Sequence, residues 1–223
     1  NYRVLSVEPT DTVTTVYNFE VDEDHSYIAN QVVVHNCFVL PIPDDLGGIF
    51  ETQKRAALIH QSGGGTGFDF SSIRERDARV SRTQGKASGP VSFLRSYDAA
   101  TETIKQGGTR RGANMAVLRV DHPDIYEFIK CKIDGGITNF NISVAATDAF
   151  MEKIIGKDPD DTFNLVSPVD GRIVKSLSAS QLFSDLVDAA WSSGDPGLIF
   201  IDEVNNSRAN PNPDKYTIAA TNP

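Results

Sequence analysis

The sequence changes character at Val33-Val34-His35-Asn36-Cys37. Upstream, the chain is rich in Val, Thr, Tyr and Phe, and apolar residues alternate with polar ones over residues 17–22, as is typical of a half-buried strand. Downstream, short apolar segments alternate with amphipathic ones, which favours an α/β architecture. The stretch therefore predicts two domains, a short all-β piece at residues 1–36 and an α/β domain at residues 37–223.

The upstream piece is too short to be a complete fold. We expect strands over residues 13–21, 26–29 and 31–34. A β segment of this length cannot enclose a hydrophobic core by itself. We therefore expect it to need a partner chain or the rest of its own fold.

The downstream domain is expected to contain helices over residues 45–61, 92–105, 121–130, 147–155 and 180–191, and strands over residues 38–40, 115–120, 139–144 and 198–201. A β-hairpin should turn at Asp170-Gly171. The apolar positions expected to face the core include Leu46, Ile49, Phe50 and Ala57 in the first helix and Val187 and Trp191 in the last. The glycine run at residues 63–67 should stop the first helix.

Composition excludes several classes of function. The hydrophobic content of 39% and the charged content of 23% are ordinary for a globular protein, and the net charge of −9 argues against a nucleic-acid partner. No apolar run approaches the roughly 18 residues of a membrane span, and we expect no signal peptide, because no charged start is followed by an apolar stretch. Two distant cysteines suit a reducing cytoplasm, and the histidines and cysteines show no metal-ligand spacing, so we expect no metal site.

The triplet His35-Asn36-Cys37 can support cleavage and transfer of a peptide bond. The Asn36 side chain can attack its own carbonyl and close a succinimide, while the Cys37 thiol can accept an acyl group. A histidine can polarise that carbonyl or protonate the leaving nitrogen, and both His35 and His25 are placed in the sequence to do so. The alternative is a chance triplet that ends a buried strand.

The whole stretch from Tyr17 to Cys37 resembles the C-terminal end of inteins. This resemblance implies an incomplete Hint fold in which Asn36 cyclises, His25 and His35 assist, and Cys37 is the acceptor. It also implies that the chain needs an N-terminal intein half as its partner. Asn18 departs from the family, because many inteins carry Asp at this position.

The chain from Cys37 onward resembles the adenosylcobalamin-dependent (class II) ribonucleotide reductases. The motifs that carry this resemblance occur in the family's order: Cys37-Phe38-Val39-Leu40-Pro41, Gly63-Gly64-Gly65-Thr66-Gly67-Phe68-Asp69-Phe70-Ser71, Ala87-Ser88-Gly89-Pro90-Val91-Ser92-Phe93, Lys105-Gln106-Gly107-Gly108-Thr109-Arg110-Arg111-Gly112-Ala113-Asn114-Met115, His122-Pro123-Asp124-Ile125 and Asn139-Phe140-Asn141-Ile142-Ser143-Val144. The resemblance implies part of a ten-stranded α/β barrel, in which a thiyl radical made by the cofactor reduces ribonucleotides to deoxyribonucleotides.

The same resemblance assigns roles to four residues. Cys37 matches a redox thiol that also lies against the substrate, Gly65 matches a glycine whose backbone lies against the substrate, and Asn222 matches a substrate-binding asparagine. Asp44 matches the position that contacts the ribose of an allosteric effector. On residue type alone, Gly65 could instead form a tight turn and Asp44 could cap a helix. Cys131 matches no redox position, and we expect it to be a small residue packed at a helix end.

The resemblance also implies the partners: a ribonucleoside di- or triphosphate substrate, a deoxynucleoside triphosphate effector, a thioredoxin-like reductant and a second copy in a homodimer. The family's radical cysteine and its general-base glutamate would follow Pro223, so we do not expect this ribonucleoside-diphosphate reductase segment to be active alone. Two alternatives remain open. The chain could be a split-intein splicing module with the reductase segment as inactive cargo, or an α/β domain that only binds a nucleotide.

Overall fold

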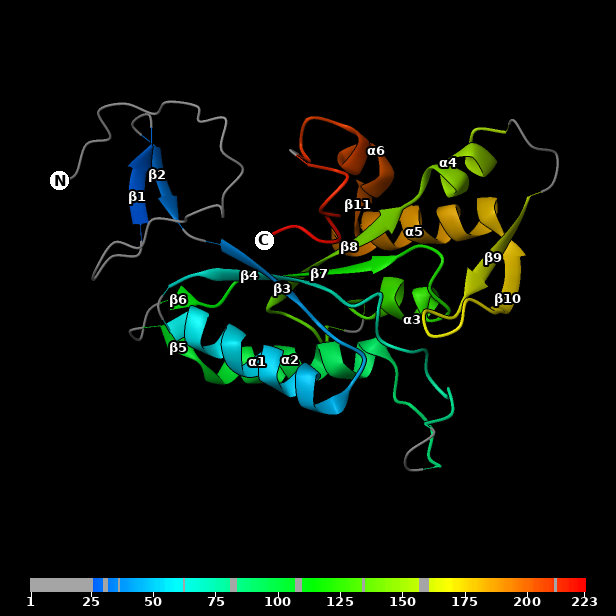
Figure 1. Ribbon diagram of the computed structural model, residues 1–223. Helices are drawn as coiled ribbons and strands as arrows, with labels where there is room; N and C mark the ends of the chain where they lie inside the picture. Colours follow the sequence, from blue (N-terminus) through cyan, green and yellow to red (C-terminus); the bar gives the residue numbers. More distant parts are fainter. Residues whose placement is uncertain are drawn as a thin grey trace.

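A five-stranded parallel sheet forms the centre of the computed structural model, which describes residues 26–29, 32–35, 37–61, 63–80, 84–106, 110–133, 135–156, 161–210 and 212–223 (Figure 1). In chain order the strands are β3 (Cys37–Pro41), β4 (Gly65–Asp69), β7 (Asn114–Arg119), β8 (Phe140–Ala146) and β11 (Gly197–Phe200). Their order in the sheet is β11-β8-β7-β4-β3, with every pairing parallel. The α/β architecture predicted from the sequence is therefore confirmed.

Helices cover one face of this sheet and bury the larger core against it. They are α1 (Leu46–Gln61), α2 (Pro90–Thr103), α3 (Ile125–Lys130), α4 (Asp148–Ile154) and α5 (Ala179–Ser193). Successive residues of a strand point to opposite faces. In β7, Ala116 and Leu118 accordingly belong to the helix-covered core, whereas Val117 belongs to a small cluster on the other face.

The opposite face carries only a partial cover. It consists of the short helix α6 (Ile201–Asn206) and the C-terminal segment, which lie across the sheet from α1 and α2 (Figure 1). Ala220 packs there with Val117, Ala145 and Ile201. The candidate site lies on this face of the sheet, beside the C-terminal segment.

Three antiparallel pairs lie outside the central sheet. They are β1 (Ser26–Ala29) with β2 (Val32–His35), β5 (Lys105–Gln106) with β6 (Arg110–Arg111), and β9 (Thr162–Val166) with β10 (Ile173–Ser178). The last pair confirms the expected hairpin, and Gly171 adopts a positive φ of 71° at its turn. Side chains of β1, β2, β5 and β6 are not described.

The buried side of α1 differs from the expected one. Ile49, Thr52, Ala56 and His60 are buried, whereas Leu46 and Phe50 are 64% and 49% exposed. The buried positions are spaced by three or four residues and so form one stripe, and Phe50 lies about 100° around the helix from Ile49. The polar members of the stripe are accommodated by hydrogen bonds, such as the one that the Thr52 hydroxyl donates to the Pro41 carbonyl at 2.9 Å.

Helix α3 also begins later than expected. The sequence predicts a helix from residue 121, with Asp121 as its cap, but the first residue of α3 is Ile125 and its N-cap is Asp124. The backbone N–H of Asp124 donates to Nδ1 of His122 at 3.0 Å, which holds the preceding residues in a turn instead of a helix.

Candidate substrate site

The first residues of β3 and β4 are paired across the sheet and form the floor of the candidate site. Cys37 is in parallel register with Gly65. A Cβ atom on Gly65 would lie 3.2 Å from the Cys37 sulfur and 2.9 Å from Cγ of Pro223. The Cys37 thiol, the Gly65 backbone and the end of the C-terminal segment thus meet at one point.

A second glycine lets the C-terminal segment lie directly on β4. A Cβ atom on Gly67 would lie 2.0 Å from the Thr221 carbonyl oxygen and 3.1 Å from Cα of Asn222. No residue with a side chain leaves room for another main chain at that distance. The structure therefore places Asn222 over Gly67 and Pro223 beside Gly65 and the Cys37 sulfur. The substrate-binding role that the family resemblance implies for Asn222 stays a prediction. The sequence reasoning overlooked Gly67, although its spacing of two residues from Gly65 places both on the same face of a strand.

The two cysteines have different surroundings. Cys37 is partly exposed and free, whereas Cys131 is buried at the C-terminal end of α3. Burial raises the pKa of the Cys131 thiol to about 12, because desolvation disfavours the thiolate. Since the thiolate is the reactive form, Cys131 is a packed, unreactive thiol, as expected from the sequence.

Asp44 lies at the other end of β3, away from Cys37, and is held by Arg74. Its Oδ1 accepts the Arg74 backbone N–H at 3.0 Å, and its Oδ2 accepts from the Arg74 Nε at 2.8 Å. The alternative role of helix cap belongs to Asp45, whose Oδ1 accepts the Gly48 N–H at 2.8 Å. Asp44 and Arg74 are about a quarter exposed, so they form a polar pair that remains accessible to a ligand.

The proposed splicing residues are only partly within the described chain. His35 is the last residue of β2, and its side chain is not described. His25 and Asn36 lie outside the described residues.

A chain of buried polar side chains lies on the helix-covered side of the sheet, behind Gly65. Nε2 of His60 lies 2.8 Å from the Thr66 hydroxyl, which donates to Oδ1 of Asn114 at 2.6 Å. The Asn114 amide donates in turn to the Asn139 carbonyl and to the Thr101 hydroxyl, each at 3.1 Å. These side chains tie α1, α2, β4, β7 and the start of β8 together, and the sequence reasoning did not identify them.

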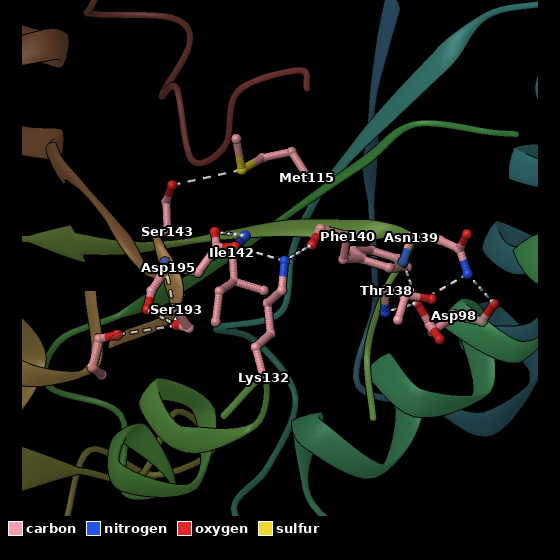
Figure 2. Close-up of polar contacts among 11 residues, drawn as sticks. Asp98, Met115, Lys132, Thr138, Asn139, Phe140, Ile142, Ser143, Ser193 and Asp195 are labelled. Carbon is pink, nitrogen blue, oxygen red and sulfur yellow. Dashed lines mark hydrogen bonds and ion pairs between the residues drawn. The ribbon is translucent and has the colours of Figure 1, made fainter. Parts of the chain in front are cut away.

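The start of β8 is held from two directions (Figure 2). On one side, Oδ1 of Asp98 accepts the N–H groups of Thr138 and Asn139 at 3.1 and 2.8 Å. On the other side, Lys132 donates to the Phe140 carbonyl at 2.5 Å and forms an ion pair with Asp195 at 2.6 Å. Both contacts fix the amino end of the sheet, which is the end that carries Cys37 and Gly65.

Two further cavities open on the described surface. One, of about 530 Å³, lies at the carboxyl ends of β3 and β4 and is lined by Val39, Asp69 and residues 217–220 among others. Burial raises the pKa of the Asp69 carboxyl, because desolvation disfavours its charged form. The other, of about 560 Å³, lies between the end of β7 and the β9–β10 hairpin.

Among the described residues, no group of His, Cys, Asp and Glu could hold a metal ion, and no helix is long and apolar enough to cross a membrane.

Comparison with known proteins identifies the family. Residues 35–223 match the family model of the ribonucleotide reductase barrel domain. The chain is 51% identical over 189 residues to a vitamin B12-dependent ribonucleoside-diphosphate reductase of Thermoplasma acidophilum, covering 84% of this chain and 24% of the relative. It is 48% identical over 189 residues to the enzyme of that name from Mycobacterium tuberculosis, covering 84% and 27%. A vitamin B12-dependent ribonucleotide reductase of Streptomyces avermitilis is 35% identical over 198 residues, covering 78% and 20%.

The fold and the site define an α/β domain with a free thiol at the start of a strand. The chain belongs to the ribonucleotide reductase barrel-domain family. It spans about a quarter of the length of these curated relatives.

Proposed function

We propose that this chain forms part of the active site of a ribonucleotide reductase that acts on ribonucleoside diphosphates. The observation that carries the proposal is that the Cys37 thiol, the Gly65 backbone and Pro223, the residue after Asn222, meet at the amino end of the sheet. The names of two relatives support the diphosphate as the substrate. The five parallel strands would make one half of a ten-stranded barrel, with the Cys37 face turned inward.

The proposed roles follow from the chemistry of the three residues. Cys37 acts as one thiol of a dithiol, whose partner cysteine comes from another part of the enzyme. The dithiol supplies two electrons and two protons, so that the ribose 2′-hydroxyl leaves as water, hydrogen replaces it and a disulfide forms. Gly65 lets the ribose approach the backbone, and Asn222 hydrogen-bonds the substrate. A thioredoxin-like reductant would restore the dithiol.

We propose adenosylcobalamin as the radical-generating cofactor, supported by the names of the relatives. Neither the cavity of about 530 Å³ nor the one of about 560 Å³ is large enough to enclose a corrinoid, because cavities of this size suit drug-sized ligands. We propose that other parts of the complete enzyme contribute the cofactor site. A deoxynucleoside triphosphate effector at Asp44 and Arg74 and a homodimeric assembly complete the proposal.

The test compares the two cysteines in a complete reductase that carries this segment. We expect Cys37→Ser to lower kcat by at least about 10³-fold, because an essential redox group is removed. The matched control Cys131→Ser should keep kcat within about twofold, since that thiol is buried and unreactive. Turnover by the Cys37→Ser enzyme with a dithiol reductant would refute the assigned role.

We propose, as a second function, that residues 1–36 are the C-terminal piece of an intein that is removed at the Asn36–Cys37 bond. The observation that favours it is the residue set His35-Asn36-Cys37 placed where the reductase match begins, at residue 35. Cys37 would then serve first as acyl acceptor in splicing and later as redox thiol. In that case the reductase segment would be the host that splicing restores.

The splicing proposal is tested by mass spectrometry. The chain is mixed with a matching N-terminal intein half that carries a short upstream peptide. We expect this peptide to be transferred from the intein half to Cys37, and the Asn36–Cys37 bond to break with release of a fragment that ends in Asn36 succinimide. Asn36→Ala should prevent the release, because alanine cannot cyclise. If the chain stays intact with a folded partner half, splicing activity is refuted and the reductase proposal is unaffected.

A further inference from the structure

His60 is a buried histidine with one ring nitrogen unpaired. It is only 1% exposed, at the end of α1. Nε2 lies 2.8 Å from the Thr66 hydroxyl, whereas Nδ1 has no hydrogen-bond partner among the described residues. An unpaired buried polar atom is unfavourable, so packing alone would favour an apolar ring at this position.

The neighbouring hydrogen bonds decide which nitrogen of His60 carries the proton. Asn114 donates through its amide nitrogen to the Asn139 carbonyl, which can only accept, and this fixes the orientation of the amide. The Asn114 oxygen therefore faces Thr66 and must receive the single hydroxyl proton of that residue. The Thr66 oxygen is left as an acceptor, so Nε2 of His60 is the donor and Nδ1 carries a bare lone pair.

This hydrogen-bond chain is attached directly to the candidate site. Thr66 follows Gly65, and the Thr66 backbone N–H donates to the Ala113 carbonyl at 3.0 Å. That carbonyl oxygen lies 3.4 Å from the position of a Cβ atom on Gly65. The imidazole also lies against Gly112, where a Cβ atom would be 2.9 Å from both Cγ and Nδ1 of His60. One ring therefore contacts β4 at Thr66 and, at Gly112, the segment that precedes β7.

We infer that His60 is a positioning residue for reduction: in its neutral Nε2–H form it holds Thr66, and with it the Gly65 backbone, at the working distance from Cys37. This inference rests on the proposed function, since it concerns the same site. The donor at Nε2 explains why a histidine occupies the position although Nδ1 stays unpaired. Gly112 leaves the space that the His60 ring occupies, because only a residue without a side chain fits against this ring.

The experiment uses a complete reductase carrying this segment and compares two substitutions. In His60→Phe the donor is lost, and we expect kcat to fall about tenfold or more with KM changed less than threefold, because small misplacements act on the reacting geometry. In His60→Gln the side-chain amide can reach the place of Nε2 and donate to Thr66, so most of kcat should return. Gly112→Ala should reproduce the His60→Phe defect by pushing against the ring.

His122 provides the matched control. It is buried to a similar degree, at 3% exposure, but both its nitrogens are paired, with the Ile73 carbonyl and the Asp124 N–H. We expect His122→Phe to lower the melting temperature and to leave kcat unchanged. If His60→Phe behaves in the same way, with reduced stability and unchanged kcat, His60 is merely structural and the inference is overturned.

The tautomer is measured independently of turnover, by NMR of the protein labelled with ¹⁵N-histidine. We expect the proton on Nε2 and a bare Nδ1 for His60, with the Nε2 signal changed in Thr66→Val. A proton on Nδ1 would overturn the inference even if the enzyme is active. An inactive wild-type enzyme with the expected tautomer would instead count against the proposed function.

Discussion

The main-chain carbonyl oxygen of Thr221 lies 2.0 Å from the place where a Cβ atom on Gly67 would start. The absent side chain of Gly67 therefore determines the path of residues 221–223 across the sheet. The positions of Asn222 over Gly67 and of Pro223 beside Gly65 depend on this contact.

Gly67→Ala should displace the C-terminal segment from the sheet. We expect a loss of about 1–3 kcal/mol in the free energy of unfolding, as for an overpacked site, and a fall of about 10²-fold in kcat/KM of the complete enzyme. Urea denaturation and steady-state kinetics measure the two effects. Gly47→Ala is the control, because Gly47 lies in α1 and meets only the Asp45 side chain at 3.3 Å. Unchanged kinetics in Gly67→Ala would contradict the close packing described here.

The two thiols should differ strongly in reactivity. In the native protein, iodoacetamide should modify Cys37 and spare Cys131, because Cys131 is buried and its pKa is raised to about 12. In denaturing urea both should react at similar rates. Peptide mass spectrometry after timed quenching measures the two rates. Equal modification in the native state would show that Cys131 is accessible.

The pair of Asp44 and Arg74 should affect effector binding more than stability. We expect Asp44→Asn to weaken binding of a deoxynucleoside triphosphate to the complete enzyme about tenfold or more, since a charge-assisted contact is lost. The loss of stability should stay within about 1 kcal/mol, because both side chains are partly exposed. Isothermal titration calorimetry measures the affinity. Asp77→Asn, which breaks the exposed pair with Lys86, is the control and should leave the affinity unchanged.

Stability should fall in mild acid because of His60. Burial lowers the pKa of this imidazole below its ordinary value of about 6.5, so the unfolded state binds the proton more readily than the native state. The contribution of neutral His60 is thus complete above pH 6.5 and declines as the pH falls toward the native pKa. Denaturant unfolding at pH 7.5, 6.0 and 5.0 should show a smaller pH dependence in His60→Gln than in the wild type. An equal slope in the two proteins would mean that His60 does not titrate differently on folding.

Sequence patterns predicted most helices of the described chain and four strands of the central sheet, but not β4, the strand that carries Gly65. The run of glycines at residues 63–67 indicated only the end of a helix, because glycine disfavours strands. In the structure Gly65 begins β4, the strand between β3 and β7. The reason is tertiary: the open face of β4 receives the C-terminal segment, whose contact no local pattern could reveal.

Helix faces were predicted less well than helix positions. In α5 the apolar stripe is wider than the buried one, so Val187 and Trp191 are 47% and 91% exposed. Hydrophobic periodicity identifies an amphipathic helix but does not show how much of its apolar side is covered by the described chain.

The sequence pointed to individual residues of the candidate site but not to their partners. The resemblance identified Cys37, Gly65, Asn222 and Asp44, while the pairing of Asp44 with Arg74 depends on two loops brought together by the sheet. The hydrogen bonds that link His60, Thr66 and Asn114 join residues from three elements, so sequence spacing alone could not show them.

The ion pair between Lys132 and Asp195 affects how the sheet responds to ionic strength. Its two side chains are only 16% and 17% exposed, so dissolved ions screen their attraction far less than that of the open pair between Lys86 and Asp77. Salt concentrations that loosen the protein's outer charge pairs would leave the amino ends of β8 and β11 joined. The amino end of the sheet is therefore tied, at the edge formed by β8 and β11, by a contact that persists at high ionic strength.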